Sequence, residues 1–349
     1  MKTPSSPQKR KLQCICGSTF RQAYNTKPCS ECNTLQHPEC IGSLLKMKRY
    51  VCPQCQLKQI DPFLKHRLNF HISLIKTTEN KSESTHEFRF FLNKDQLTKV
   101  TSNSFLIIRS LLLNEKGFKL EWTNYFRLEL NKKKITYALN SKKWLTKSHN
   151  SPFVFAFNET YKDNINKTNE KHFPYDKQIF SFKEYFNIGL NLIKMIIRYD
   201  KEDPDINSYA LSVDLVELFQ NIDAVIKYLP RVHTISESQR YIQFEDGVDK
   251  EKINLYDHYT LCERIVLPGR GVACNHLGVF DVKRFLIGNI HIRKYTCPIC
   301  MKYANKCYID EIMKNVIEKE EVRNCNCLVM DYNYNVHIKG EDNKELFVN

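Results

Sequence analysis

The 349-residue sequence lacks the features that would place it in a membrane or in the secretory pathway. It has no run of eighteen apolar residues, which a membrane-spanning helix requires. Its first residues, MKTPSSPQKRKLQ, contain no apolar signal core. It also lacks a glycine-rich phosphate loop and any Ser/His/Asp or Cys/His constellation of a nucleophilic enzyme. We therefore expect no membrane partner and no secretion.

Basic residues are in excess, with 53 lysines and arginines against 39 aspartates and glutamates. The formal net charge of +14 favours an anionic partner, and nonspecific contact with nucleic acid is one expectation. Lysines spread over solvated surfaces would explain the excess equally well. The cluster Lys9, Arg10 and Lys11 fits a nuclear localisation signal, although basic runs this short also occur by chance.

Cysteine is abundant, and its spacing points to metal ligation. Ten of the 14 cysteines stand in CxC or CxxC pairs, with histidines between some pairs. In a chain of this length such pairs fit metal sites better than disulfides, so we expect a reducing compartment.

The most informative stretch runs from Gly269 to Ile317. It holds one complete ligand set for a tetrahedral zinc ion: Cys274, His276, Cys297 and Cys300. A short helical stripe follows each ligand pair. The stripes are Phe280, Asp281, Phe285 and Leu286 after the first, and Ile309, Ile312, Met313, Val316 and Ile317 after the second.

The order R-G-x-x-C-x-H-L…F-D-x-x-x-F-L…C-P-x-C…I-D-x-x-x-x-x-I resembles the SP-RING of the Siz/PIAS family of SUMO ligases. The resemblance implies a RING fold in which one of two zinc sites survives, held by the four ligands above. The residues agree, since Cys262 stands where the other site would begin but no cysteine or histidine follows it closely, and Val279 occupies a place where many family members carry cysteine. An isolated structural zinc knuckle without ligase activity is the alternative.

A second cysteine-rich segment, residues 12–58, contains eight candidate ligands: Cys14, Cys16, Cys29, Cys32, His37, Cys40, Cys52 and Cys55. The pattern of four cysteines, one histidine and three cysteines resembles a PHD finger. That resemblance implies cross-bracing, with Cys14, Cys16, His37 and Cys40 on one zinc ion and Cys29, Cys32, Cys52 and Cys55 on another. Metals should supply most of the folding free energy of so short a segment.

Some PHD fingers bind histone tails, and methyl-lysine readers surround the ammonium with aromatic rings. Here Leu35 stands where many readers have tryptophan, so a methyl-lysine cage is not expected. A contact with histone tails or with the conjugating enzyme and a purely structural zinc module remain alternatives.

The middle of the chain, residues 61–246, is predicted to be β-rich. Strand patterns cover His86–Leu92, Phe105–Leu113, Tyr125–Leu130 and Tyr209–Val216. The spacing then becomes helical from Leu215 onward, and Pro230 ends the helix.

Three stretches of this region resemble the PINIT domain that precedes the SP-RING in Siz/PIAS ligases. They are HEFRFFLNKDQLTKV, LEWTNYFRLELNKKKI as a strand hairpin, and NLIKMIIRYDKEDPDINSYALSVDLVE as a closing strand pair. The resemblance implies substrate selection by this domain. Candidate contacts are Lys132, Lys133, Lys134 and Trp144, and the alternative is a solvated hairpin face.

By the same resemblance the catalysis would be positional, with no covalent intermediate and no catalytic side chain of its own. The first loop, Cys262-Glu263-Arg264-Ile265, departs from the family's Cys-Pro-aliphatic start, while Pro298 and Ile299 keep the second loop. We predict Ile265, Pro298 and Ile299 as contacts of the conjugating enzyme. The run Cys327–Asp331 fits either a SUMO-binding strand or a plain β-hairpin.

Together these patterns predict an α+β multidomain protein. Its parts are a PHD-type finger (12–58), a PINIT-like β-rich domain (61–246), a single-zinc SP-RING with short helices (254–320) and a C-terminal extension (321–349). We expect a nuclear SUMO ligase with three zinc ions, whose partners are SUMO, its conjugating enzyme and nuclear or chromatin substrates. A catalytically inactive chromatin scaffold or histone-tail-binding subunit is the alternative. A ubiquitin ligase is less consistent, because an ordinary RING keeps both zinc sites.

Overall fold

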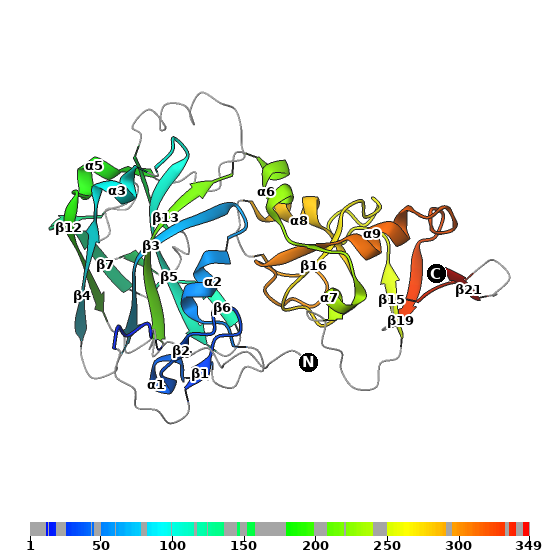
Figure 1. The fold of residues 1–349 in the computed structure, drawn as a ribbon, viewed down its shortest axis with the longest axis horizontal. Coiled ribbons are helices and arrows are strands. Elements are labelled where there is room, and N and C mark those ends of the chain that lie inside the picture. The colour runs from blue at the N-terminus through cyan, green and yellow to red at the C-terminus, as the bar shows by residue number, and fades with distance from the viewer. Residues whose placement is uncertain are drawn as a thin grey trace, which may run out of the picture. The chain divides into compact units, whose positions relative to one another are not determined.

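The computed structural model describes residues 12, 14–18, 26–42, 44, 50–59, 61–77, 82–98, 100–114, 117–123, 125–135, 145–146, 152–157, 179–198, 208–219, 221–239, 250–290, 295–331, 335–339 and 345–348. The chain divides into two compact units (Figure 1). Unit 1 comprises Met1–Ile60 and Leu64–Leu218, and unit 2 comprises Asp61–Phe63 and Phe219–Asn349.

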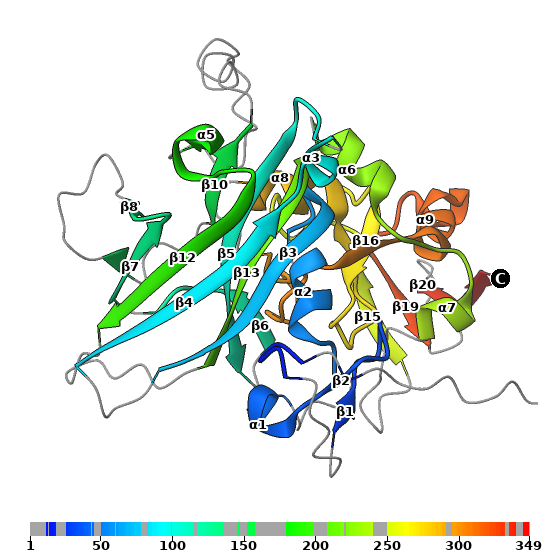
Figure 2. The same ribbon diagram turned by 60° about the vertical axis from the view of Figure 1, so that its left-hand side comes forward.

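Unit 1 is built on two sheets (Figure 2). The first has the order β11-β10-β5-β13-β3 with β6 beside β5, and the second has the order β4-β12-β7-β8 with β9 beside β7. The first sheet contains β3 (Leu64–Lys76), β5 (Ser104–Asn114), β6 (Gly117–Leu120), β10 (Phe153–Ala156), β11 (Ile179–Ser181) and β13 (Ser208–Leu218). The second contains β4 (Glu83–Leu92), β7 (Tyr125–Leu130), β8 (Lys133–Lys134), β9 (Leu145–Thr146) and β12 (Gly189–Arg198).

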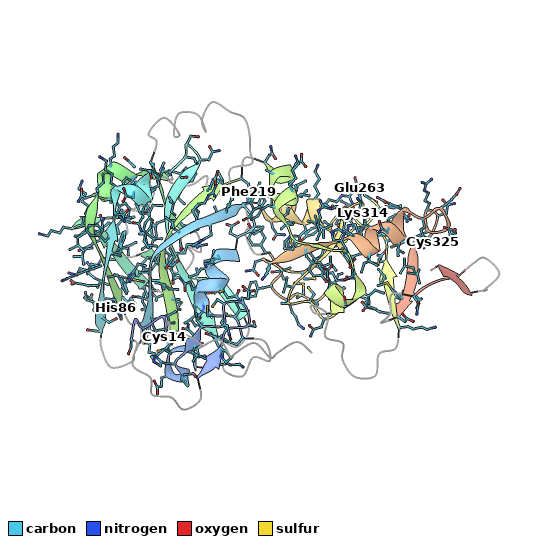
Figure 3. All side chains as sticks on the ribbon, in the orientation of Figure 1. Cys14, His86, Phe219, Glu263, Lys314 and Cys325 are labelled. Carbon is cyan, nitrogen blue, oxygen red and sulfur yellow. The ribbon has the colours of Figure 1, made fainter. Side chains whose placement is uncertain are left out.

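The two sheets share one apolar core, which strands of both sheets line. On β13, Tyr209, Leu211 and Val213 face this core, together with Trp122 and Phe126, whose rings stack at 4.8 Å. Two short helices, α3 (Lys94–Leu97) and α5 (Phe182–Tyr185), follow β4 and β11. Figure 3 shows the side chains that fill the unit.

The four strands predicted from the sequence are present as β4, β5, β7 and β13, and β7 and β8 form the predicted hairpin. One interpretation needs correction. The stretch interpreted as a closing strand pair supplies β12 and β13, but these lie in different sheets, where β12 pairs with β4 and β7 and β13 pairs with β3 and β5.

The N-terminal cysteine-rich segment packs on the outer face of the first sheet. Its elements are β1 (Lys27–Pro28), β2 (Leu35–Gln36), α1 (Pro38–Ile41) and α2 (Pro53–Gln59). Its buried side chains form one cluster with Leu111, Leu113 and Ala210 of the sheet. Helix α2 lies beside β3 and β5 (Figure 2). The segment therefore shares its hydrophobic core with the sheet.

Unit 2 contains two four-stranded sheets, with the orders β14-β18-β16-β17 and β15-β19-β20-β21. The first consists of β14 (Arg231–Val232), β16 (Pro268–Gly271), β17 (Phe280–Asp281) and β18 (Cys307–Asp310). The second consists of β15 (Lys250–Asn254), β19 (Cys327–Asp331), β20 (Val336–Lys339) and β21 (Glu345–Val348). The helices are α6 (Ile222–Tyr228), α7 (Ile235–Gln239), α8 (Val282–Asn289), α9 (Glu311–Glu318) and the 3₁₀ helix η2 (Glu320–Val322).

The helix predicted before Pro230 exists, but it begins later than the apolar spacing predicts. Strand β13 continues through Leu218, and the helix begins at Ile222. The Asn221 side chain accepts a hydrogen bond from the Ala224 amide at 2.8 Å and so caps the helix. Because a buried strand and a helix both place apolar residues in this stretch, periodicity alone does not separate them.

The segment 219–239 belongs to unit 2, whereas the predicted β-rich domain extended to residue 246. Helix α6 packs against α8, and β14 pairs in parallel with β18. The C-terminal extension also joins the core of unit 2 through Val322, Leu328, Met330 and Val336. In the part of the chain that the structure describes, no helix is long and apolar enough to cross a membrane.

Candidate metal centres and docking surface

Three groups of cysteine and histidine side chains converge, and each offers four ligand atoms that all lie within 4.8 Å of one another. The groups are Cys14, Cys16, His37 and Cys40; Cys29, Cys32, Cys52 and Cys55; and Cys274, His276, Cys297 and Cys300. These are the three sets that the sequence patterns implied.

The interatomic distances fit tetrahedral zinc. The Sγ atoms are 3.7 Å apart for Cys32 and Cys52, and also for Cys274 and Cys300. Zn–S bonds of about 2.3 Å at tetrahedral angles place two sulfur atoms about 3.8 Å apart. Cys–His pairs are slightly closer, 3.3 Å in the first group and 3.4 Å in the third, as the shorter Zn–N bond requires. The donors present thus fit zinc at all three centres.

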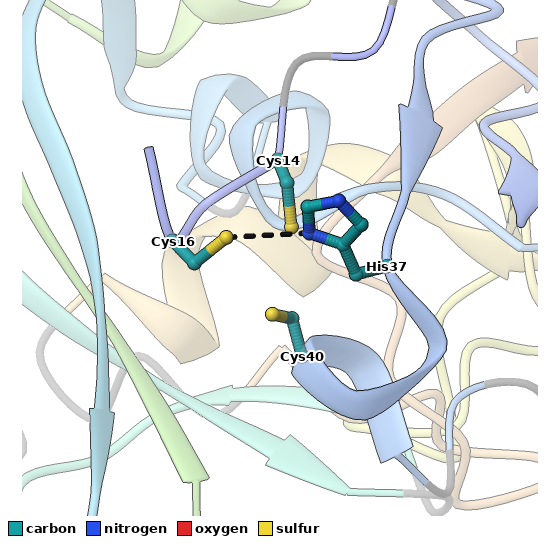
Figure 4. Close-up of side chains that lie close together, drawn as sticks. All are labelled: Cys14, Cys16, His37 and Cys40. Carbon is teal, nitrogen blue, oxygen red and sulfur yellow. Dashed lines mark hydrogen bonds between the residues drawn. The ribbon is translucent and has the colours of Figure 1, made fainter. Parts of the chain in front are cut away.

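In the first group the side chains point toward one another from separate segments (Figure 4). His37 directs Nδ1 toward Cys16 Sγ, at 3.3 Å. Pro38 then starts α1, and this single turn carries Cys40 back to the group. His37 is buried and Cys16 is exposed, so the centre is open on one side.

In the second group, backbone amides support the sulfur atoms. Cys29 Sγ accepts hydrogen bonds from the amides of Cys52 at 3.2 Å and Glu31 at 3.4 Å. Cys32 Sγ lies 2.9 Å from Thr34 Oγ1. Hydrogen bonds of this kind stabilise thiolates.

In the third group, hydrogen bonding fixes the orientation of the histidine. His276 Nδ1 lies 2.8 Å from the carbonyl oxygen of Gly278, which leaves Nε2 facing Cys297 Sγ. The Glu251 carboxylate on β15 accepts hydrogen bonds from the amides of Leu277 at 2.6 Å and Gly278 at 3.2 Å. Such outer contacts orient ligands and select the tautomer that binds metal.

Within a group, the pKa of one thiol is lowered while that of a neighbouring thiol is raised. Hydrogen bonding from the Cys274 thiol, with a smaller contribution from His276, lowers the pKa of Cys297 to about 4 against the effect of burial. Hydrogen bonding with Cys29 raises the pKa of Cys52 to about 12, while the pKa of Cys29 itself is lowered. Several thiolates at one point repel, so all can ionise together only around a cation. This is the electrostatic pattern of a metal centre.

Unit 2 holds a buried ion pair beside its ligand group. The guanidinium of Arg270 pairs with Asp310, and neither side chain is exposed. Arg270 Nε also donates to the carbonyl oxygens of Leu277 at 2.9 Å and Gly278 at 3.2 Å. Asp310 in turn caps α9 by accepting from the Met313 amide at 2.9 Å. The pair therefore connects the ligand loop to the second helix, a role that spacing alone did not suggest.

Asp281 makes a second connection that the sequence did not reveal. Its Oδ1 accepts from the Arg284 amide at 3.0 Å and caps α8. Its Oδ2 accepts from the amides of Val266 at 2.9 Å and Leu267 at 3.1 Å. One carboxylate thus anchors both a helix and the chain that leads into β16.

Residues 260–303 match the family model for the MIZ/SP-RING zinc finger. The E3 SUMO-protein ligase SIZ1 of Oryza sativa subsp. japonica is 22% identical over 342 residues, covering 90% of this chain. The predicted Siz/PIAS-type resemblance is confirmed. The chain spans 36% of the length of the rice protein.

Two solved structures of Saccharomyces cerevisiae SUMO E3 ligases are also similar. SIZ2 is 15% identical with a TM-score of 0.37, over 79% of this chain and 98% of the other. SIZ1 is 16% identical with a TM-score of 0.37, over 82% of this chain and 92% of the other.

Of the predicted docking residues on the SP-RING, Ile265 is in the wrong place for a contact. Its side chain is 1% exposed and belongs to the core of unit 2. Its amide donates to the Leu255 carbonyl at 2.9 Å, which draws this part of the chain inward. Pro298 and Ile299 are half-buried and keep some surface. Tyr295 is buried, and its hydroxyl donates to Asp61 Oδ1 at 3.0 Å.

Other apolar side chains of the SP-RING are strongly exposed. They are Leu261, Val266 and Met301, each more than two-thirds exposed, with Ile287 and Tyr259 about half exposed. Val266 directly follows the buried Ile265, and Leu261 stands four residues before it.

The predicted substrate contacts on unit 1 are exposed where they are described. Lys132, Lys133 and Lys134 all face solvent in the turn and short strand after β7. Lys133 Nζ donates to the Glu184 carbonyl at 2.6 Å. Trp144 lies outside the described residues.

Proposed function

We propose that the protein is a SUMO ligase that docks a SUMO-charged conjugating enzyme on its SP-RING and promotes transfer of SUMO to lysines of nuclear or chromatin proteins. The observation that carries this proposal is the coincidence of the MIZ/SP-RING match with a formed Cys274–His276–Cys297–Cys300 group. The similarity to a rice SUMO ligase over most of this chain supports it.

The catalysis we propose is positional. A thioester-linked SUMO already carries its activation, so the ligase needs only to hold the charged enzyme and the substrate lysine in a reactive arrangement. Orientation of two reactants can supply roughly 7–11 kcal/mol of a barrier at the extreme. Zinc at the third centre would hold the second loop in shape. The acyl transfer itself needs no reacting side chain from this protein.

The docking surface we propose consists of exposed and half-buried apolar side chains on or next to both loops. Tyr259 and Leu261 belong to the first loop and Val266 follows it, while the second loop contributes Pro298, Ile299 and Met301. This set replaces Ile265, whose burial excludes a direct contact. Apolar contacts that become buried in a complex are the usual source of its affinity.

We further propose that the PHD-type segment holds two zinc ions in unit 1, which with the SP-RING makes three. Its apolar side chains are continuous with the outer face of the first sheet. This continuity favours a structural role for the finger over an independent reader of histone tails. Substrate contact through Lys132, Lys133 and Lys134 stays a proposal supported by their exposure.

An inactive chromatin scaffold is the second candidate, because the first loop departs from the family pattern and Ile265 is buried. Single-turnover discharge of SUMO from its charged conjugating enzyme separates the two. The wild-type chain should accelerate discharge, and Met301→Asp should abolish most of the acceleration. Leu190→Asp in unit 1, a side chain that is 63% exposed, serves as the matched control and should act like wild type. A zinc-loaded wild type without acceleration at saturating concentration would favour the scaffold.

A further inference from the structure

Two loops of the SP-RING begin with the same backbone turn, although the first loop closes one residue later than the second. In the second loop, Cys297–Lys302, the Cys297 amide donates to the Lys302 carbonyl at 2.8 Å and the Met301 amide donates to the Cys297 carbonyl at 3.0 Å. In the first loop, Asp257–Glu263, the Asp257 amide donates to the Glu263 carbonyl at 2.8 Å and the Leu261 amide donates to the Asp257 carbonyl at 2.8 Å. Asp257 thus occupies the position that Cys297 occupies in the second loop.

The resemblance continues at the tip of each loop. Leu261 and Met301, each four residues after the loop begins, have left-handed φ angles of 59° and 60°. Non-glycine residues seldom adopt this conformation. Their side chains are 74% and 73% exposed. The two loops therefore present an apolar side chain in the same way.

The side chains that hold the loops differ in chemistry. Cys297 Sγ, a candidate zinc ligand, accepts from the Ile299 amide at 3.4 Å. Asp257 Oδ2 accepts from the Tyr259 amide at 3.1 Å and the Thr260 amide at 3.2 Å. A carboxylate that binds amides two and three residues ahead closes a turn without metal.

Thr260 completes this parallel. It stands three residues after Asp257, as Cys300 does after Cys297, and its Oγ1 accepts from the Glu263 amide at 3.3 Å. The pattern D-x-x-T therefore replaces C-x-x-C in the first loop. Cys262, which the sequence suggested as the start of a second site, is exposed five residues beyond Asp257.

We propose that Asp257 is a positioning residue, and that its carboxylate holds the first loop in the shape of a zinc knuckle without zinc. By this equivalence Tyr259 stands where the second loop has Ile299, and Leu261 stands where it has Met301. Asp257 is fully buried, so it acts on a partner only through these neighbours. The docking role rests on the proposed function, whereas the role in loop shape does not.

The proposed contact Tyr259 is itself anchored. Its hydroxyl lies 3.2 Å from Asn289 Nδ2, and its ring centroid lies 6.5 Å from that of Phe285, both on α8. A shift of the first loop would therefore move the exposed ring away from its support on the helix.

Two variants test the proposal in the full chain. Asp257→Ala removes both amide contacts, while Asp257→Asn keeps an oxygen that can accept them. We expect Asp257→Ala to speed amide hydrogen exchange about tenfold at residues 259–263 and to leave residues 299–302 unchanged. Asp257→Asn should restore most of the protection. Wild-type exchange in Asp257→Ala would overturn the assignment.

The docking consequence is measured separately, by discharge kinetics with SUMO-charged conjugating enzyme as the probe. The KM for the charged enzyme should rise about tenfold in Asp257→Ala, with kcat at saturation within about twofold of wild type. A lower kcat with an unchanged KM would contradict a positioning role. If wild type gives no discharge, the proposed function fails, and the exchange experiment still decides the role of Asp257 in the loop.

Discussion

Among the residues that the structure describes, unit 1 buries the pair Arg109–Asp214 and unit 2 buries the pair Arg270–Asp310, and the two pairs are built in opposite ways. In unit 1 the carboxylate is the centre, since Asp214 contacts Arg109, His66, Asn69 and Ser212. In unit 2 the guanidinium is the centre, since Arg270 contacts Asp310 and the carbonyls of the ligand loop. A sheet has its own backbone partners, whereas a zinc loop leaves carbonyl groups that need a donor. Unit 2 therefore has an arginine at the centre of its buried network, whereas unit 1 has an aspartate.

The pKa of Asp214 reflects this arrangement. Burial alone would raise it, but the Arg109 guanidinium and the hydrogen bond from His66 hold the pKa well below its usual range. In unit 1, Arg109 and His66 thus offset the cost of burying the Asp214 charge, while the pair in unit 2 also depends on the loop that carries the zinc ligands.

Metal removal should give the largest effect, because it leaves several thiols packed together without the cation that would hold them. Zinc binding contributes about 10–16 kcal/mol to the folding of small fingers. With a chelator, we expect loss of hydrogen-exchange protection in the N-terminal finger and at residues 297–302 of the second loop. The first loop, held by Asp257, and the strands β4 and β12 should stay protected. Release of zinc with no change in exchange would show that packing alone holds the finger.

Removing one partner of the buried pair in unit 2 should come next. Asp310→Ala leaves Arg270 buried without its counter-charge, and we expect about 3–5 kcal/mol less stability in urea unfolding. Glu311→Ala is the matched control, since Glu311 pairs with Arg231 near the surface and should cost less than about 1 kcal/mol. Equal effects of the two variants would contradict the importance of burial.

A methyl group beside the zinc ligands should have a moderate effect. A Cβ on Gly271 would lie 2.7 Å from Ala304 Cβ and 3.0 Å from Cys274 Sγ. We expect Gly271→Ala to destabilise unit 2 by about 1–3 kcal/mol and to weaken zinc retention, measured by competition with a chromophoric chelator. Gly288→Ala on α8 is the control, because its nearest neighbour is Tyr259 Cε1 at 3.5 Å and alanine favours a helix. A Gly271→Ala variant as stable as Gly288→Ala would disprove the close packing.

The smallest effect should come from acid in unit 1. Burial lowers the pKa of His71 and His86 below 6.5, so the unfolded chain binds protons more readily than the folded one. Stability is then complete above pH 6.5 and decreases as the pH falls through the lowered values. Because both rings keep solvent contact, we expect less than about 1 kcal/mol from each. Unfolding midpoints between pH 7 and 5 should vary less in a His71→Gln, His86→Gln variant than in wild type.

The sequence predicted the elements that have strong local signals. Four strands, the two helices after the ligand pairs and the third ligand group follow from period and spacing, and the resemblance to a PHD finger implied the grouping of the N-terminal cysteines. It did not predict that β12 and β13 belong to different sheets, because strand pairing is a long-range property. The docking residues that we propose were harder still to predict. Ile265 and Val266 are both apolar neighbours, and only the tertiary structure decides that the first is 1% and the second 70% exposed.

The role that we propose for Asp257 could not be predicted from the sequence either, for a different reason. Its equivalence to Cys297 lies in hydrogen bonds and φ angles, and an aspartate does not resemble a cysteine in any sequence pattern. Similarly, only the strand pairing in the structure tests whether Cys327–Asp331 could be a SUMO-binding strand. Strand β19 pairs with β15 on one edge and β20 on the other, so neither edge is free to receive an added strand.

The shared core of unit 2 has a practical consequence for the choice of a soluble fragment. A fragment limited to residues 254–320 would lack β14 and α6 at one end and Leu328, Met330 and Val336 at the other. The surfaces that these elements cover, on β18, α8 and the buried core of unit 2, would become exposed to solvent and prone to aggregation. A fragment that begins before Phe219 and retains the C-terminal strands would keep these surfaces covered, although it would lack Asp61, which accepts the hydrogen bond of the Tyr295 hydroxyl.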